Sequence, residues 1–147
     1  MVTKTEAALG VALIATIIIA ATVILTLNRS ISNVGRIRAI GLDIFRDSNC
    51  TDVLTQIDWG LLSPGDTAAV TMYARNSGNV NVTLNYNLTD WSPVSASTYL
   101  IVAWNYSGQM LKPFDVVSIQ VTLTVSPSIS GVENFSYTMN VNAVEVK

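Results

Sequence analysis

Residues 79–89 read NVNVTLNYNLT and alternate without interruption between apolar side chains and amides or hydroxyls. A period of two places successive side chains on opposite faces of a β-strand, whereas an amphipathic helix needs a period of 3.6. Residues 116–125 alternate in the same way. Both stretches therefore predict strands with one packed face and one solvent-exposed face. The apolar lines are Val80, Val82, Leu84, Tyr86 and Leu88 in the first stretch, and Val117, Ile119, Val121, Leu123 and Val125 in the second.

The chain from residue 36 onward repeats this pattern between turn signals. We expect strands at residues 36–47, 53–60, 67–75, 79–89, 99–106, 116–125 and 134–146. Pro64 and Gly65 predict a turn with positive φ at the glycine, and the residues NSGN at 76–79 predict a hairpin turn. Seven short strands separated by turns indicate an all-β fold, a single antiparallel sandwich over residues 36–147. The large side chains expected in its core or at its corners are Trp59, Trp91, Trp104, Phe135 and Tyr137.

A hydrophobic segment precedes the predicted sandwich. Residues 7–27 contain 21 consecutive residues without a charge, and a helix of that length is about 31 Å long, which matches the hydrocarbon thickness of a bilayer. We expect a transmembrane helix between an N-terminal flank, residues 1–6, and a short linker, residues 28–35. A cleaved signal peptide is the alternative, although its apolar region is usually shorter and no small-x-small cleavage site follows this one. Small residues at every fourth position favour close packing and self-association of the helix in a membrane: Ala8, Ala12, Thr16 and Ala20.

Two opposing signals bear on the orientation of the domain. Arg29, Arg36 and Arg38 follow the helix, whereas Lys4 and Glu6 precede it, so a count of positive charges places the domain in the cytoplasm. The outer strand positions carry Asn, Thr and Ser rather than Lys and Glu, and six N-x-S/T sequences are acceptors for N-linked glycan. Because residues i and i+2 share a strand face, a polar outer face also generates such sequences without glycosylation. We expect the domain outside the cell, with glycan candidates at Asn49, Asn81, Asn87, Asn105 and Asn134, while Asn28 abuts the helix.

The composition excludes several classes of chemistry. The chain has no histidine, which removes Ser–His and Cys–His nucleophile pairs and the commonest metal ligand. Its net charge of −2 provides no basic stripe for nucleic acid, and its single cysteine, Cys50, cannot form an internal disulfide. Asp43 and Asp47 flank a predicted strand end and Asp52 follows, so their oxygens are candidate ligands of a calcium loop, but solvated turn carboxylates are the default interpretation. We therefore expect no cofactor, no bound metal and no catalysis.

The run LLSPGDTAAVTMYARNSGNVNVTL resembles the Ig-like domains of archaeal and bacterial cell-surface proteins, including the cell-adhesion-related type. Those domains share a Pro-Gly-Asp turn, a strand, an Asn-x-Gly-Asn turn and a strand of alternating Val and Leu. The matching positions here are Pro64, Gly65, Asp66, Asn76, Gly78 and Asn79. The resemblance implies a single Ig-like β-sandwich of about seven strands behind the helix, in a non-catalytic envelope or adhesion protein.

A second run, EAALGVALIATIIIA, resembles the hydrophobic helix of archaeal pilins and archaellins, which forms a filament core beneath an outer β-sandwich. Two functions are therefore predicted. The first is a membrane-anchored, glycosylated surface protein with a structural or adhesive role, in contact with membrane lipid and with the domain outside the cell. The alternative is a subunit of an extracellular pilus-like filament. Neither prediction names a further envelope protein or glycan as partner.

Overall fold

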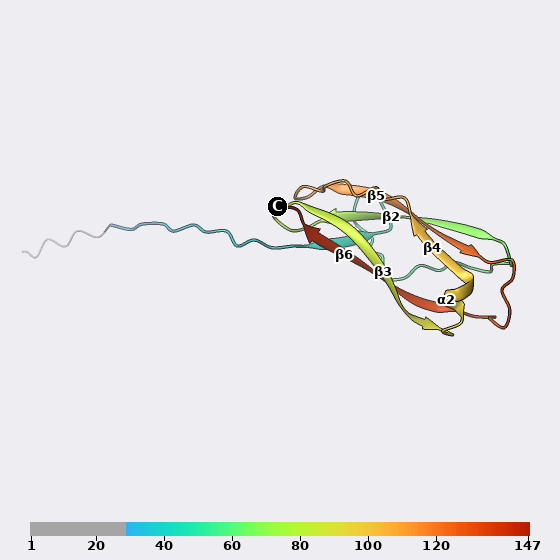
Figure 1. Ribbon diagram of the computed structural model, residues 1–147. Coiled ribbons are helices and arrows are strands. Elements are labelled where there is room, and N and C mark those ends of the chain that lie inside the picture. Colours follow the sequence, from blue (N-terminus) through green and yellow to red (C-terminus); the bar gives the residue numbers. More distant parts are fainter. Residues whose placement is uncertain (1–28) are drawn as a thin grey trace, which may run out of the picture. The chain divides into compact units, whose positions relative to one another are not determined.

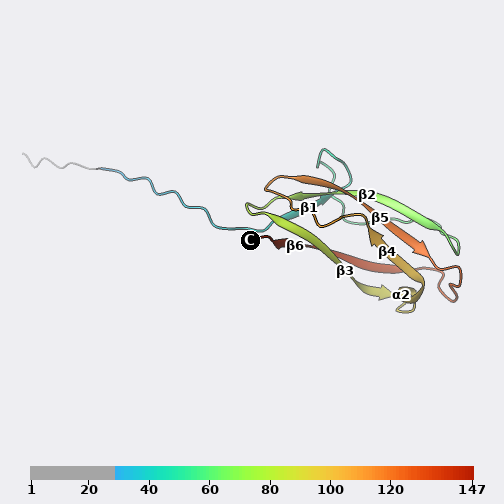
Figure 2. The same cartoon turned by 45° about the horizontal axis from the view of Figure 1, so that its top comes forward.

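A computed structural model describes residues 29–147 of the chain, which divides into two units, Met1–Gly35 and Arg36–Lys147. The second unit is an antiparallel sandwich, and Figures 1 and 2 show its two sheets as separate layers. One sheet has the strand order β1-β2-β5-β4 and the other consists of β3 and β6. The all-β, two-sheet prediction is confirmed. The elements are β1 (Leu42–Phe45), β2 (Thr67–Asn76), β3 (Val82–Ser92), the short helix α2 (Ala96–Tyr99), β4 (Leu100–Trp104), β5 (Val116–Val125) and β6 (Ser136–Glu145).

The core lies between the two sheets and is built from the alternating apolar positions. Ile119, Val121 and Leu123 of β5 are completely buried, whereas Ser118 and Gln120, which alternate with them along the strand, are exposed. The apolar lines predicted for residues 79–89 and 116–125 both face inward. Each strand thus turns one face to the core and the other to water, as the alternation predicts. The five predicted large side chains are half-buried and pack against this core: Trp59, Trp91, Trp104, Phe135 and Tyr137.

Residues 76–79 form a crossover between the sheets, not the predicted hairpin turn, because β2 and β3 belong to different sheets. Asn76 is fully buried there, and its side-chain amide donates to the carbonyls of Val80 (2.8 Å) and Leu111 (3.1 Å). Gly78 is not at positive φ. Glycine is needed because it has no side chain, which lets the backbone of residue 78 lie against that of Gly41. A Cβ at residue 78 would lie 2.6 Å from the backbone nitrogen of Gly41.

Two predicted strands differ from the observed ones. The strand expected at 36–47 is limited to β1, and the preceding residues are held by the crossover instead. Asn79 accepts from the N–H of Ala39 (2.8 Å) and donates to the carbonyl of Ile37 (2.7 Å) through its side chain.

The prediction of a strand at residues 53–60 is wrong. Only Val53 makes a bridge, to Phe45, and Gly60 at φ +69° bends the backbone away from a strand path. Residues 29–147 accordingly contain six strands and not seven.

The predicted transmembrane helix at 7–27, its packing positions Ala8, Ala12, Thr16 and Ala20, and Asn28 lie outside the described residues. Within residues 29–147, no helix has both the length and the apolar character needed to span a bilayer.

Candidate functional site

The outer face of the β3–β6 sheet carries a group of neighbouring amides and hydroxyls. The register places Asn85 opposite Asn142, Asn87 opposite Asn140, and Thr89 opposite Thr138. The residues between them along each strand point toward the core. Because side chains alternate between the two faces of a strand, these six polar side chains all lie on the outer face. We call these six residues the amide face.

Hydrogen bonds connect the amide face diagonally across the two strands. The amide of Asn142 donates to the side-chain oxygen of Asn87 (3.2 Å), and the amide of Asn140 donates to the hydroxyl of Thr89 (3.0 Å). Thr89 in turn donates to the Asp90 carboxylate (2.8 Å). Diagonal neighbours in an antiparallel pair are within reach of such side chains. The face is therefore an ordered polar ladder in the folded domain.

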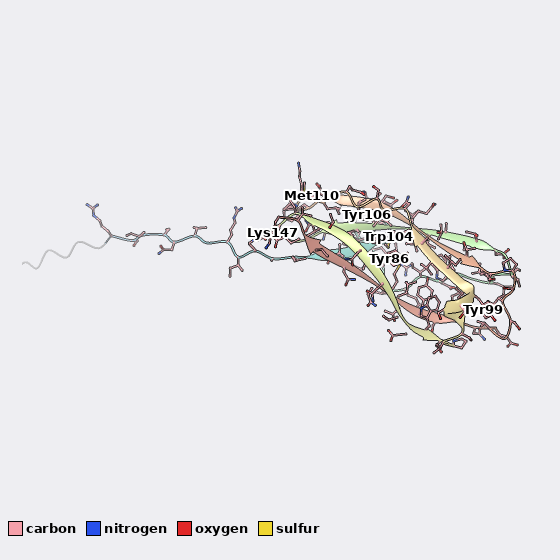
Figure 3. All side chains as sticks on the ribbon, viewed as in Figure 1. Tyr86, Tyr99, Trp104, Tyr106, Met110 and Lys147 are labelled. Atoms are coloured by element: carbon pink, nitrogen blue, oxygen red, sulfur yellow. The ribbon has the colours of Figure 1, made fainter. Side chains whose placement is uncertain are left out.

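One side of the sandwich, between β3 and β4, is closed by aromatic side chains. Tyr86 and Trp104 meet edge to face with ring centroids 4.6 Å apart, and Trp104 meets Tyr106 at 5.4 Å. Figure 3 shows the three side chains in a row along this side. Tyr86 also donates its hydroxyl to the carbonyl of Val102 in β4 (3.0 Å), which joins the two sheets directly.

The opposite side of the sandwich is open. A cleft of about 580 Å³ lies between residues 54–60 and β6. Its floor includes the core residues Ile44 and Met72, and its rim carries Asp58, Glu133 and Asn134. No cation lines it within the described residues. A cleft of this volume is within the range of ligand sites and of grooves that receive an extended peptide.

An aromatic cluster stands at this cleft. Tyr137 stacks on Trp91 with centroids 4.6 Å apart and accepts a hydrogen bond from the indole N–H of Trp59 (3.1 Å). Burial raises the pKa of the Tyr137 hydroxyl above its ordinary value of 10.0, Tyr86 adds to the increase, and the hydrogen bond from Trp59 opposes it. The hydroxyl is therefore neutral at physiological pH. Trp59 lies in the cleft wall because residues 53–60 leave the strand path, which the sequence did not predict.

The structure places the five candidate glycosylation sites at different surfaces. Asn81 and Asn87 belong to the outward positions of the β3 strand region, and Asn105 directly follows β4. Asn49 lies in the turn after β1, and Asn134 lies in the loop before β6, at the cleft rim. All are exposed except Asn81, which is half-buried. The structure does not bring them together into one site.

The carboxylates proposed for a calcium loop serve the turn itself. Asp47 accepts hydrogen bonds from the N–H groups of Thr51 (3.0 Å) and Asp52 (2.8 Å), and from the Thr51 hydroxyl (2.8 Å). These bonds lower the pKa of the Asp47 carboxyl below its ordinary value, with the Asp52 N–H contributing most. Asp43 faces Arg75 at 3.2 Å and Asp52 faces Arg46 at 3.7 Å. In the part of the chain that the structure describes, no three His, Cys, Asp or Glu residues cluster to hold a metal ion.

Neither of the two comparisons with known proteins identifies a relative: the sequence matches no protein-family model and has no significant match among curated proteins.

Proposed function

We propose that this chain is a membrane-anchored surface protein whose sandwich is displayed outside the cell in a structural or adhesive role and carries N-linked glycan. The observation that carries the proposal is the amide face together with the uncharged segment at 7–27. A soluble cytoplasmic domain usually covers its surface with Lys and Glu. Here the six residues of the amide face carry no charge, and they include the Asn and Thr of an N-x-T acceptor on adjacent outward positions, Asn87 and Thr89.

The strand order supports an Ig-like type of sandwich. In constant-type immunoglobulin domains one sheet has the order A-B-E-D and the other C-F-G. The order β1-β2-β5-β4 corresponds to the first sheet, and β3-β6 corresponds to C and F. The place of strand G, beside β6, is where the cleft lies. The strand order therefore favours an Ig-like arrangement, in which residues 29–147 place no strand beside β6 at the position of G.

The carboxylates support a non-catalytic role. Several of them cap turns: Asp66 accepts from the N–H of Ser63 (2.7 Å), Asp115 from that of Lys112 (2.8 Å), and Asp58 from that of Gly60 (2.9 Å). A general acid or base needs a free carboxyl held near a second catalytic group. The chain also contains no histidine to assist.

Protease treatment of intact cells, followed by intact-mass measurement, tests this proposal. We expect external protease to remove the domain and the purified protein to be heavier than the bare chain by glycan. Replacing Asn87 by Gln should remove one glycan mass, whereas Asn85→Gln, on the same face but outside an acceptor sequence, should leave the mass unchanged apart from the substitution. A domain protected in intact cells, with the mass of the bare chain, would overturn the proposal.

A pilus-like filament subunit is the second candidate, favoured by the likeness of the N-terminal run to archaeal pilins. In that case the apolar helix leaves the bilayer and packs in a fibre. Mechanical shearing of cells separates the two functions. A filament subunit is released with sheared fibres, whereas an anchored protein stays in the membrane pellet.

A further inference from the structure

The two sheets have four outer strand edges, and three of them receive at least one hydrogen bond from a residue outside their own sheet. Exposed edges invite pairing with other chains, and native proteins usually cover them. At β1, the N–H of Leu54 donates to the carbonyl of Ile44 (2.9 Å). At β4, the Tyr86 hydroxyl donates to the carbonyl of Val102. At β3, Leu111 exchanges two backbone hydrogen bonds with Val82, at 2.8 and 2.9 Å.

The edge of β6 is the exception. The Val146 N–H donates to the carbonyl of Asn81 (2.9 Å) in continuation of the β3–β6 register, and bonded pairs alternate along an antiparallel ladder. Met139, Val141 and Ala143 therefore direct their backbone N–H and C=O groups away from β3. Among residues 29–147, no group donates to these carbonyls or accepts from these N–H groups.

The β6 edge also lacks the features that protect exposed strands. Residues 136–144 contain no charge and no proline, and the only register shift in this sheet lies at its far end, between Thr89 and Ser92. Lysines, prolines, inward charges and bulges are the usual protections. The inward side chains of Met139, Val141 and Ala143 stay half-buried. The cleft beside residues 136–141 leaves the space next to the edge open.

We propose that the β6 edge pairs with the β6 edge of a second copy of this chain, antiparallel, about a twofold axis at Val141. This arrangement joins β3-β6 of one copy to β6-β3 of its partner in a continuous four-stranded sheet. The axis at Val141 places Met139 opposite Ala143 of the other copy, so a large side chain meets a small one. The interface is isologous and therefore closes as a dimer.

A second copy is the occupant that the charges and the amide face favour. A strand without charge meets its own copy without repulsion, whereas like charges directly opposite would destabilise the pair. The same axis places Asn140 opposite Asn142 of the other copy. The observed Asn85–Asn142 and Asn87–Asn140 pairs are thereby extended into two rows of four asparagines across the joined sheet. Asparagine ladders of this kind stabilise stacked strands. The dimer requires only the sandwich, so it does not depend on the proposed surface location.

Site-specific disulfide formation tests the register in the full chain, purified in detergent from a host that adds no N-glycan. Asn140→Cys and Asn142→Cys are prepared separately, each with Cys50→Ser. Asn140 and Asn142 are bonded to β3 and so form non-bonded, closely spaced pairs at the new edge, where Cβ atoms approach to about 4.5–5.5 Å. We expect a covalent dimer on oxidation of the mixture and little in either variant alone. A mixture of Asn85→Cys and Asn87→Cys, from the same face but away from the edge, is the control and should remain monomeric.

Charge placed on the edge gives a second measurement. In Asn140→Lys/Asn142→Lys, each lysine faces a lysine of the other copy, and the dissociation constant measured by analytical ultracentrifugation should rise by about tenfold or more. Mixing this protein with Asn140→Asp/Asn142→Asp should restore association as a heterodimer. Asn85→Lys/Asn87→Lys carries the same charge without facing the partner and should change little.

If the copies associate only through the N-terminal helix, the lysine substitutions in β6 should leave the dissociation constant unchanged, and the β6 cysteine mixture should form no specific disulfide. That result, or a disulfide yield in the mixture no higher than in the β3 control, overturns the proposal.

Discussion

Asn76 and Asn79 are the same residue type three positions apart, and the side chain of each bonds backbone groups at the crossover between the sheets. Asn76 does so in the core, for the carbonyls of Val80 and Leu111 and for the N–H of Gly78 (3.0 Å). Asn79 does so at the surface, for residues 37 and 39. A buried amide is costly unless all its partners are present, so the crossover geometry depends on Asn76 in particular.

Replacing Asn76 by Ala should lower the free energy of unfolding by about 2–4 kcal/mol, because the Val80 carbonyl loses its donor and the buried Gly78 N–H loses its acceptor. Urea unfolding monitored by tryptophan fluorescence provides the measurement. Asn85→Ala, exposed on the amide face, is the matched control and should change stability by less than about 0.5 kcal/mol. Equal effects of the two substitutions would contradict this role of Asn76.

Gly78→Ala should destabilise the domain by about 1–3 kcal/mol, because the added methyl group cannot be accommodated without moving the backbone of Gly41. The melting temperature of the variant measures this effect. Gly35→Ala is a suitable comparison, since nothing lies within 4 Å of a Cβ at that position and its φ is not positive. We expect its melting temperature to equal that of the unmodified chain.

Tyr137 should make the domain sensitive to alkali. Its pKa is raised in the folded state, so its contribution is fully present below pH 10.0, the ordinary tyrosine value, and is lost as pH rises through the folded pKa. Tyr137→Phe should lose the acceptor for Trp59, at a cost of about 1 kcal/mol at pH 7, yet show a smaller loss of stability above pH 10. If both proteins lose stability in parallel between pH 9 and 11, another group is responsible.

At the scale of elements, the turn at residues 46–52 is organised by a single carboxylate. Asp47 holds it closed, and the turn returns the chain so that Leu54 can bond to Ile44 and cover the edge of β1. The residues between Leu54 and the start of β2 form no strand. The element that protects one edge of the sandwich thus depends on a single side chain in a turn.

Acid should weaken this turn. The folded pKa of Asp47 is depressed, so its stabilising effect is present above pH 3.8 and is lost as pH falls through the folded pKa. Asp47→Ala should therefore melt at a lower temperature than the unmodified chain at pH 7, and the difference should shrink as pH falls below 3.8. Asp52→Ala removes only a surface ion pair and should have little effect at either pH.

The strands that the sequence predicted best are those with uninterrupted alternation. The strand predicted at 116–125 coincides with β5. Its buried and exposed faces follow directly from the types of neighbouring residues, such as apolar Ile119 and polar Gln120. Residues 53–60 also alternate, but a strand needs a neighbour, and β6 lies too far across the cleft to supply one. Likewise, the NSGN sequence predicted a hairpin because turn chemistry does not state which sheet the next strand joins. The cleft and its aromatic cluster arise from this missing pairing and could not be predicted from local pattern.

At the scale of the whole molecule, aromatic side chains around Trp104 cover one side of the sandwich, and the cleft lies on the other. The segment before β1 is attached separately, by hydrogen bonds to the crossover at residues 76–79. Four hydrogen bonds hold residues 37–41 there, two from the Asn79 side chain and two between backbones, Ser77 to Gly41 (3.1 Å) and Asn79 to Ala39 (2.9 Å). Arg38 also pairs with Glu145. The folded unit therefore begins before β1.

Truncation distinguishes this boundary from the strand boundary. A chain beginning at residue 36 should unfold cooperatively with the stability of the intact sandwich, because it retains every contact of the crossover. A chain beginning at residue 42 should lose about 2–4 kcal/mol, from four hydrogen bonds. Denaturant unfolding of the two chains checks the difference, and equal stabilities would show that residues 37–41 contribute nothing.

The attachment of residues 37–41 has a further consequence for how the domain can be rebuilt. Because Arg38 contacts Glu145 and Val146 bonds to Asn81, the start and the end of the folded unit lie at the same pole, where Figure 1 shows the C-terminus beside the incoming chain. A short peptide could join Lys147 to residue 36, and the chain could be reopened in the loop at 126–135. Such a circular permutant would keep both sheets and their order while moving the new ends to the far pole.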